Sequence, residues 1–320
     1  MRLSITNMPR PASAVLSAFV LLVIAVFAAC GSEPDEPADG KITVVTTTYP
    51  LTFMARRIGG SRVSVVQLIK SGVEAHDFEP VPSNVRTIAS ADIFFYNHPA
   101  FEPWALAAAT ASGSRSGGTA QSNAIQTVIL ESEGEDHGSQ EVNDADFDPH
   151  VWLNPLRAQE QAERIAAALV TDDPEGSLEY VRNSDGLEAE LRGLDELIAR
   201  RLSDCALGTA VVSHLAYGHM AERYGFNQLG LAGLSPEFES GPSHIASVIR
   251  QIDELGIRYI LQEPIASDRL AETVAAEAGV DILIMHPLAV RTFDEAKAGA
   301  DYFSIMQANS EVLAMALQCS

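Results

Sequence analysis

Short apolar runs alternate with segments of helical period along most of the chain. In the first half, residues 42–48, 63–69 and 92–97 are apolar and β-branched, which predicts strands, and residues 83–91 predict a helix with Ser83 as its N-cap. The second half repeats the pattern, with strands expected near 209–214, 259–264 and 281–288, and with a helix after Ser243. Alternation of this kind predicts parallel sheets covered by helices on both faces.

One longer helical stretch separates these halves. Between residues 176 and 203 the apolar positions recur every three or four residues, at Leu187, Leu191, Leu194, Ile198 and Leu202. A single helix of that length would rise about 40 Å, enough to connect two domains. We therefore expect one domain over residues 41–175, a linker helix over 176–203 and a second domain over 204–320.

The first thirty residues are typical of a secretory signal. Arg2 and Arg10 precede an apolar run at residues 12–29, which ends in small residues and Cys30. A membrane helix is the weaker alternative, because no basic flank follows. The sequence FAAC resembles a bacterial lipobox, which predicts lipidation of Cys30; Phe27 departs from the usual leucine and leaves cleavage after Ala29 as the alternative. Residues 31–40 are acidic and rich in proline, as expected of a flexible tether.

Charge and cysteine content narrow the choice of partners. The chain has 43 acidic and 21 basic residues and a net charge of −22, which disfavours nucleic acid and anionic membrane surfaces and favours cations. The acidic stretch 131–146, with His137, predicts a loop. Cys205 and Cys319 form an even pair, so a disulfide is expected in an oxidising compartment, with two free thiols as the alternative.

Four histidines lie at or near places where ligands bind in parallel sheets, beyond the carboxyl ends of the strands. Any one of them alone would more often be an ordinary hydrogen-bonded residue. Four at comparable positions indicate a metal site, because neutral imidazole is a standard ligand of Zn²⁺ and other late transition metals. No HExxH or CxxC motif is present, so the fold itself must assemble the site. The candidates are His76, His150, His214 and His286.

Several blocks of the sequence resemble a known family. AHDFEPVPSNV, DIFFYNHPAFEPW, FDPHVWLNP, SHLAYGHMAERYG and ILQEP with ILIMHPL are similar to the signature blocks of zinc- and manganese-binding solute-binding lipoproteins of ABC importers. The resemblance covers residues 41–319. It implies an α/β fold of two lobes, each a parallel β-sheet flanked by helices, joined by one long connecting α-helix. It also implies His76, His150 and His214 as metal ligands.

The fourth ligand of that family is commonly an aspartate, and here its position is His286. Four imidazoles would favour Zn²⁺ over Mn²⁺, with Cu²⁺ or Ni²⁺ as alternatives, because nitrogen replaces a harder oxygen. The alternative is a three-histidine site completed by water, with His286 facing solvent. Glu263 is expected to accept a hydrogen bond from the second ring nitrogen of a ligand, or else to be an ordinary acidic residue at a strand end.

The resemblance implies a receptor and not an enzyme. We expect a monomeric, extracytoplasmic protein, lipid-anchored to the bacterial cell membrane, that captures Zn²⁺ between its lobes and delivers it to a membrane permease. The same role for Mn²⁺ or another divalent metal is the nearest alternative. A zinc hydrolase with three histidine ligands, in which His286 or Glu263 acts as general base, is the rival class. A surface adhesin has no signature in this sequence.

Overall fold

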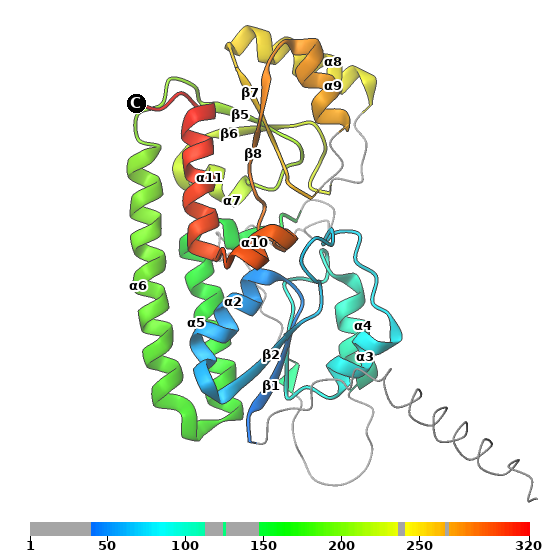
Figure 1. Cartoon of the computed structure of the whole chain (residues 1–320), viewed down its shortest axis with the longest axis vertical. Helices are drawn as coiled ribbons and strands as arrows, with labels where there is room; N and C mark the ends of the chain where they lie inside the picture. Colours follow the sequence, from blue (N-terminus) through cyan, green and yellow to red (C-terminus); the bar gives the residue numbers. More distant parts are fainter. Residues whose placement is uncertain (1–39, 113–123, 126–146, 236–240, 266–268) are drawn as a thin grey trace, which may run out of the picture. The chain divides into compact units, whose positions relative to one another are not determined.

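The structure is a computed structural model that describes residues 40–112, 124–125, 147–235, 241–265 and 269–320. The signal and tether, Cys30 and the acidic stretch with His137 lie outside the described residues. Gly40–Ser320 form one compact unit, drawn in Figure 1. Among the described residues, no helix combines the length and the apolar character needed to cross a bilayer.

The first lobe contains a four-stranded parallel sheet in the order β2-β1-β3-β4. Val44 of the central strand pairs with Val65 on one side and with Ile93 on the other. The strands are β1 (Ile42–Thr46), β2 (Val63–Gln67), β3 (Ile93–Phe95) and β4 (Ala124–Ile125), and the lobe's helices are α2 (Tyr49–Gly59), α3 (Pro82–Ala89) and α4 (Pro103–Ser112).

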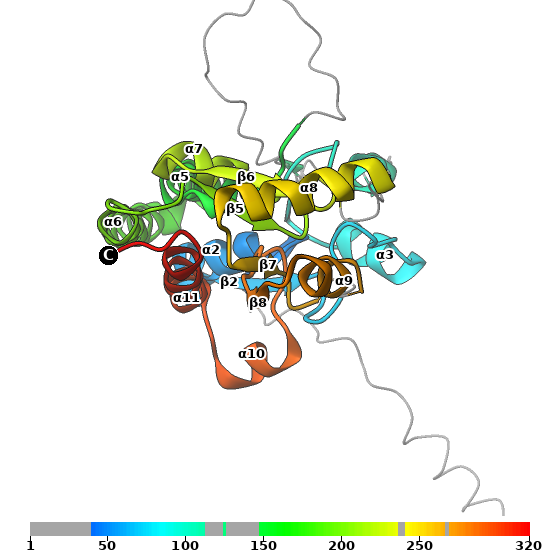
Figure 2. The same ribbon diagram turned by 90° about the horizontal axis from the view of Figure 1, so that it is seen from above.

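The second lobe repeats this arrangement. Its parallel sheet has the order β6-β5-β7-β8, so the first strand is again central and the topology of the two sheets is the same. Figure 2 shows α8 and α9 beside this sheet and α10 projecting from the unit. The elements are β5 (Thr209–Val212), α7 (Gly218–Tyr224), β6 (Asn227–Gly230), α8 (Pro242–Leu255), β7 (Tyr259–Gln262), α9 (Arg269–Ala278), β8 (Asp281–Ile284) and α10 (Phe293–Ala298).

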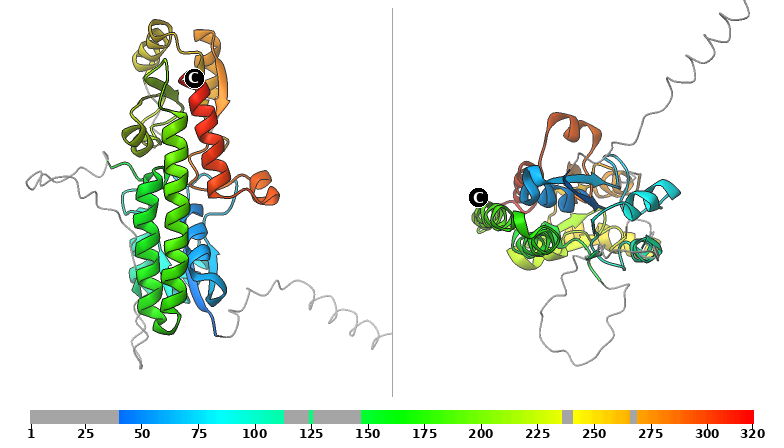
Figure 3. Two further views of the ribbon diagram at one scale, coloured as in Figure 1. Left: turned by 90° about the vertical axis from the view of Figure 1, so that its left-hand side faces the viewer. Right: turned by 90° about the horizontal axis from the view of Figure 1, so that it is seen from below.

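A long helix joins the two lobes, as the periodicity predicts. It is α6 (Ser177–Arg201), and it packs against α5 (Pro155–Asp172) and α11 (Tyr302–Ala316), side by side in Figure 3. Its buried positions include Leu187, Leu191, Leu194 and Ile198. The expected fold of two parallel-sheet lobes joined by one long helix is thus confirmed, while the domain boundaries at residues 41–175, 176–203 and 204–320 stay a prediction.

Both predicted serine N-caps are wrong. Helix α3 begins at Pro82 after the cap residue Val81, and α8 begins at Pro242 after Gly241. Proline suits the first helical position, because its fixed φ matches the helix and its missing N–H would have no partner there. The prolines therefore set both helix starts, one residue before each serine.

The two remaining cysteines are bonded to each other. The Cys205–Cys319 disulfide closes a separation of 114 residues, and the backbone N–H groups of Ala206 and Leu207 donate to the carbonyls of Gln318 and Leu317. The bond ties the segment after α11 to the segment after α6, which confirms the predicted pairing.

Candidate metal centre

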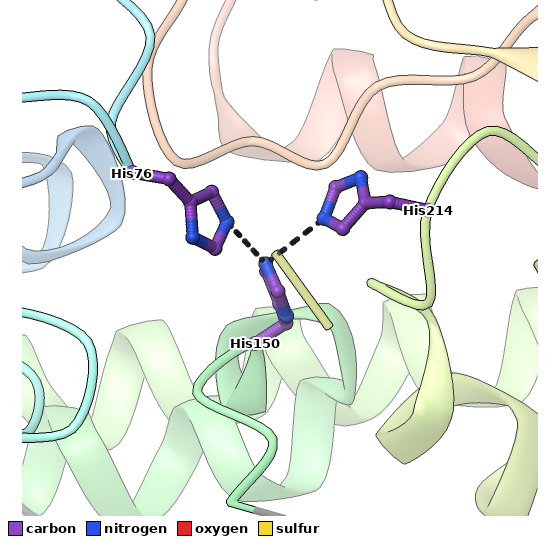
Figure 4. A group of neighbouring side chains, drawn as sticks. All are labelled: His76, His150 and His214. Atoms are coloured by element: carbon purple, nitrogen blue, oxygen red, sulfur yellow. Dashed lines mark hydrogen bonds between the residues drawn. The ribbon is translucent and has the colours of Figure 1, made fainter. Parts of the chain in front are cut away.

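Three histidines from separate segments meet at the junction of the two lobes (Figure 4). His76 lies in the loop that follows β2, His150 precedes the short 3-10 helix Val151–Leu153, and His214 follows β5 by two residues. His150 and His214 are buried and His76 is half-buried. The fold thus assembles residues that are 64 or more positions apart in the sequence.

The three rings direct the same nitrogen toward one point. His150 Nε2 lies 3.3 Å from His76 Nε2 and 3.5 Å from His214 Nε2, and Figure 4 shows His150 between the other two. Ligand nitrogens on a tetrahedral Zn²⁺ at 2.0–2.1 Å are separated by about 3.3–3.4 Å. The two separations from His150 are therefore close to those between ligands on a tetrahedral zinc ion, and all three ligand atoms lie within 4.8 Å of one another.

Two carboxylates, the half-buried Asp148 and the buried Glu263, fix the orientation of two of these rings. His150 Nδ1 donates to Asp148 Oδ1 at 2.8 Å, and His214 Nδ1 donates to Glu263 Oε1, which also accepts from Ser213 at 3.0 Å. A carboxylate can only accept, so each imidazole carries its proton on Nδ1 and keeps the lone pair of Nε2 for a metal. Glu263 therefore lies directly behind the candidate ligand His214.

The surroundings favour neutral imidazoles. Burial, with a smaller contribution from the neighbouring His150 and His214, lowers the pKa of His76 to about 2. Burial also lowers the pKa of His150, although Asp148 acts in the opposite direction. Neutral rings with converging lone pairs repel protons and attract a metal cation. Asp148 and Glu263 supply the negative charge that a divalent ion would need nearby.

Aromatic rings pack around the cluster. The Phe101 ring meets the His76 ring edge-on with centroids 4.8 Å apart, and Trp152 packs against His150 at 5.5 Å. Glu102 follows Phe101 and is fully buried, where it accepts hydrogen bonds from Asn97; burial raises its pKa to about 7. This network holds the loop that presents Phe101 to the site.

Bonds that do not involve a metal join the segments of His150 and His214. His219 Nε2 donates to the carbonyl of Asp148 at 3.0 Å, and Asn154 donates to the carbonyl of His219. Gly218 lies so close to Asp148 that a Cβ there would collide with the carboxylate. The two carboxylate-backed histidines therefore belong to one bonded frame that spans both lobes.

The structure places His286, the predicted fourth ligand, outside the cluster of three histidines. Its Nε2 donates to the Glu295 carboxylate at 3.0 Å and its Nδ1 accepts from the N–H of Leu288 at 2.9 Å. Both nitrogens are engaged, so no lone pair is left for a metal. The alternative in which His286 faces solvent is wrong, because the residue is only 4% exposed.

Asp148 is the functional residue that the sequence analysis missed. The sequence Asp148-Pro149-His150 could have indicated it, because a carboxylate two residues before a histidine can reach the histidine ring. The other described histidines lie outside the cluster, as expected. His98 accepts from Ala100 N–H, and His244 donates to the carbonyl of Gly230.

Fold and cluster together define a two-lobed α/β protein with a candidate transition-metal centre where its halves meet. The chain belongs to the family described as ZnuA, zinc-uptake complex component A, periplasmic, whose profile matches residues 44–316. The family description names uptake and not a reaction, in agreement with the expectation that the chain is not an enzyme.

Individual relatives agree with this assignment. The chain is 34% identical to the high-affinity zinc uptake system protein ZnuA of Bacillus subtilis over 308 residues, which cover 93% of this chain and 95% of that protein. It is 34% identical to the zinc-binding protein AdcA of Streptococcus pyogenes over 289 residues, or 86% of this chain. It spans about half the length of that relative, 56%.

A solved structure shows the same fold. The Zn(II)-bound ZnuA-like domain of Streptococcus pneumoniae AdcA is 30% identical and superposes with a TM-score of 0.71, covering 87% of this chain and 99% of that domain.

Proposed function

We propose that this chain is the extracytoplasmic metal receptor of an ABC importer and that it captures one Zn²⁺ ion between its lobes through His76, His150 and His214. The observation that carries the proposal is the convergence of three imidazoles, in which His150 Nε2 lies 3.3 Å from His76 Nε2 and 3.5 Å from His214 Nε2. Zn²⁺ is the cargo and not a resident cofactor. Relatives named for zinc binding and zinc uptake support the same conclusion.

The donor set favours Zn²⁺ over Mn²⁺. All three donors are imidazole nitrogens. Their ligand atoms lie within 4.8 Å of one another, and among the described residues no carboxylate oxygen joins this group. Mn²⁺ prefers harder oxygen ligands, whereas imidazole suits Zn²⁺. A water molecule would complete the tetrahedron.

The two residues named as general bases for a hydrolytic role, Glu263 and His286, are both engaged in hydrogen bonds. Glu263 accepts from both His214 and Ser213, and His286 is engaged by Leu288 and Glu295. Neither residue proposed for that role is free to activate a zinc-bound water.

We also propose that the receptor is a monomer, anchored through lipidated Cys30, and that a cognate permease is its partner. The FAAC sequence supports the anchor, and the relative from Streptococcus pneumoniae is named a zinc-binding lipoprotein. Labelling with a radioactive fatty acid tests the anchor, since Cys30→Ser should remove the label.

Competitive titration tests the metal. Purified protein, stripped of metal, is titrated with Zn²⁺ and with Mn²⁺ against a chromophoric chelator. We expect one Zn²⁺ per chain and an affinity for Mn²⁺ lower by at least about 100-fold, in line with the preference of nitrogen donors. Equal affinities, or failure to bind Zn²⁺, would contradict the proposal.

A further inference from the structure

The segment between β8 and α10 crosses from the second lobe onto the first. The backbone N–H of Tyr49 donates to the carbonyl of Ala289 at 2.8 Å, and Trp152 Nε1 donates to the carbonyl of Pro287 at 2.8 Å. The Arg291 guanidinium lies over the Tyr49 ring, 4.2 Å from its centroid. This segment is therefore bonded to the first lobe at several points that need no metal.

His286 shapes the beginning of that segment. Its ring accepts from the N–H of Leu288, a buried residue in the left-handed region at φ 63°. Asn309 bonds both the N–H and the carbonyl of His286, at 2.8 and 2.7 Å. A non-glycine residue with positive φ persists only where its surroundings over-determine it, and here the His286 ring and the Asn309 amide do so.

The far end of the segment contacts the loop that carries His76. The N–H of Gly72 donates to the carbonyl of Arg291 at 2.8 Å. The Phe293 ring covers Gly72, so that a Cβ on Gly72 would lie within 3.0 Å of three ring carbons. Phe293 is 71% exposed, which places this contact at the surface and outside the hydrophobic core.

The His76 loop and the segment between β8 and α10 also lie side by side nearer to His76. A cavity of about 10 Å³ lies between them, lined by Glu74 and Ala75 on one side and by Pro287, Ala289 and Val290 on the other. That volume holds about one water molecule at most. The His76 loop thus runs along the crossing segment from Gly72 to Ala75, directly before the candidate ligand.

We propose that residues 286–293 form a strap that holds the His76 loop in its metal-binding position, with His286 as a positioning residue and Phe293 as the contact on Gly72. The inference rests on the proposed function, since the residue that it positions is a proposed zinc ligand. The strap orders the loop before metal arrives, which strengthens binding by lowering the entropy lost on coordination. Loosening the strap should therefore speed zinc release.

Two glycine variants test the strap. Gly72→Ala introduces a Cβ against Phe293, whereas Gly279→Ala imposes a similar positive φ, +70° against +77°, where nothing lies within 4 Å. Both variants carry the backbone strain, and only the first disturbs the strap. We expect zinc release into excess chelator to become about tenfold faster in Gly72→Ala, the scale seen when groups behind metal ligands are changed. Equal release rates in the two variants would overturn the proposal.

A second pair avoids backbone strain altogether. Phe293→Ser removes the exposed ring over Gly72, and Leu178→Ser removes an exposed apolar side chain, 87% exposed, from α6. Hydrogen exchange of the metal-free protein should quicken at residues 73–79 in Phe293→Ser and stay unchanged there in Leu178→Ser. This measurement needs no zinc, so it still tests the strap if the wild-type protein fails to bind zinc and the proposed function is wrong.

A double-mutant cycle separates a strap from a direct ligand. His286→Gln should speed zinc release in the wild-type background, and its effect should disappear when His76→Ala is also present, because the strap acts through His76. If His286 touched the metal itself, its loss would weaken binding in both backgrounds. Additive effects would therefore refute the assignment of His286 as a positioning residue.

Discussion

His150 and His214 are held differently from His76. Each of the first two donates its Nδ1 proton to a carboxylate, and their segments are bonded to each other through His219 and Asn154. His76 has an aromatic neighbour in Phe101, and in the described part of the chain its Nδ1 has no hydrogen-bond partner. We infer that His150 and His214, the fixed pair, set the geometry of the metal site, and that His76, on a loop, completes it.

Loss of the central ligand should have the largest effect. His150 Nε2 lies near both other nitrogens, so His150→Ala removes the shared corner of the site. We expect zinc affinity to fall by more than about 100-fold, beyond the range found for changes behind the ligands. Chelator competition measures it, with His244→Ala as the control. If His150→Ala lowered the zinc affinity less than His76→Ala does, His150 would not be the more important ligand of the two.

Removing the carboxylates should have the next largest effect. Asp148→Asn and Glu263→Gln keep the shape but lose the charge that fixes each tautomer, and each should weaken zinc binding about 10- to 100-fold. Glu74→Gln is the matched control near His76, since Glu74 accepts from the backbone N–H of His76 and an amide oxygen can replace it. We expect less than about a threefold change there by the same reasoning. Equal losses in all three variants would remove the distinction between the fixed pair and His76.

Acid should weaken the metal-free protein as well as release zinc. Because burial lowers the pKa of His76 and of His150 below the value of about 6.5 in unfolded chains, the unfolded state binds more protons as the pH falls. The stability from these neutral rings is present above about pH 6.5 and is lost below it, at up to about 1.4 kcal/mol per pH unit for each ring.

Urea unfolding between pH 7 and pH 5, with chelator present, measures this slope. His76→Gln should make it shallower, since one of the two rings no longer titrates. A slope that is unchanged in the variant would show that the folded His76 ring takes up its proton over the same pH range as it does in the unfolded chain.

The disulfide should have the smallest effect on zinc. Cys205 and Cys319 lie at the ends of α6 and α11, and the double variant to alanine leaves the cluster untouched. Removing the loop closure should lower the free energy of unfolding by about 2–4 kcal/mol. Denaturant unfolding measures this loss, and zinc titration should give the wild-type affinity. A changed affinity would mean that this link supports one side of the site.

Much of the fold could be predicted from periodicity. The repeated strands and helices gave two parallel sheets, and the spacing of Leu187, Leu191, Leu194 and Ile198 gave the connecting helix. Helix starts were less predictable, because serine and proline both mark them and the prolines at 82 and 242 set the start here. The short strand β4 has only two residues, too few for a periodic signal.

The site was predicted in part. A position after a strand places the Cα of a residue, but it does not say where the side chain points. His286 follows β8 by two residues, yet its orientation is set by Glu295 and Asn309, which come 9 and 23 residues later. No local pattern contains such contacts. Asp148 was recognisable in principle, since it lies within hydrogen-bond reach of His150 through a single proline.

The unbroken α6 also affects the calorimetry of metal binding. Its 25 residues contain no proline, and it packs on a helix of each lobe. A connector of this kind resists large rotation, so metal capture should bury little additional apolar surface. The heat capacity change of binding scales with that surface. Zinc uptake by this chain should therefore have an enthalpy that hardly varies with temperature, the signature of coordination and not of a closing hinge.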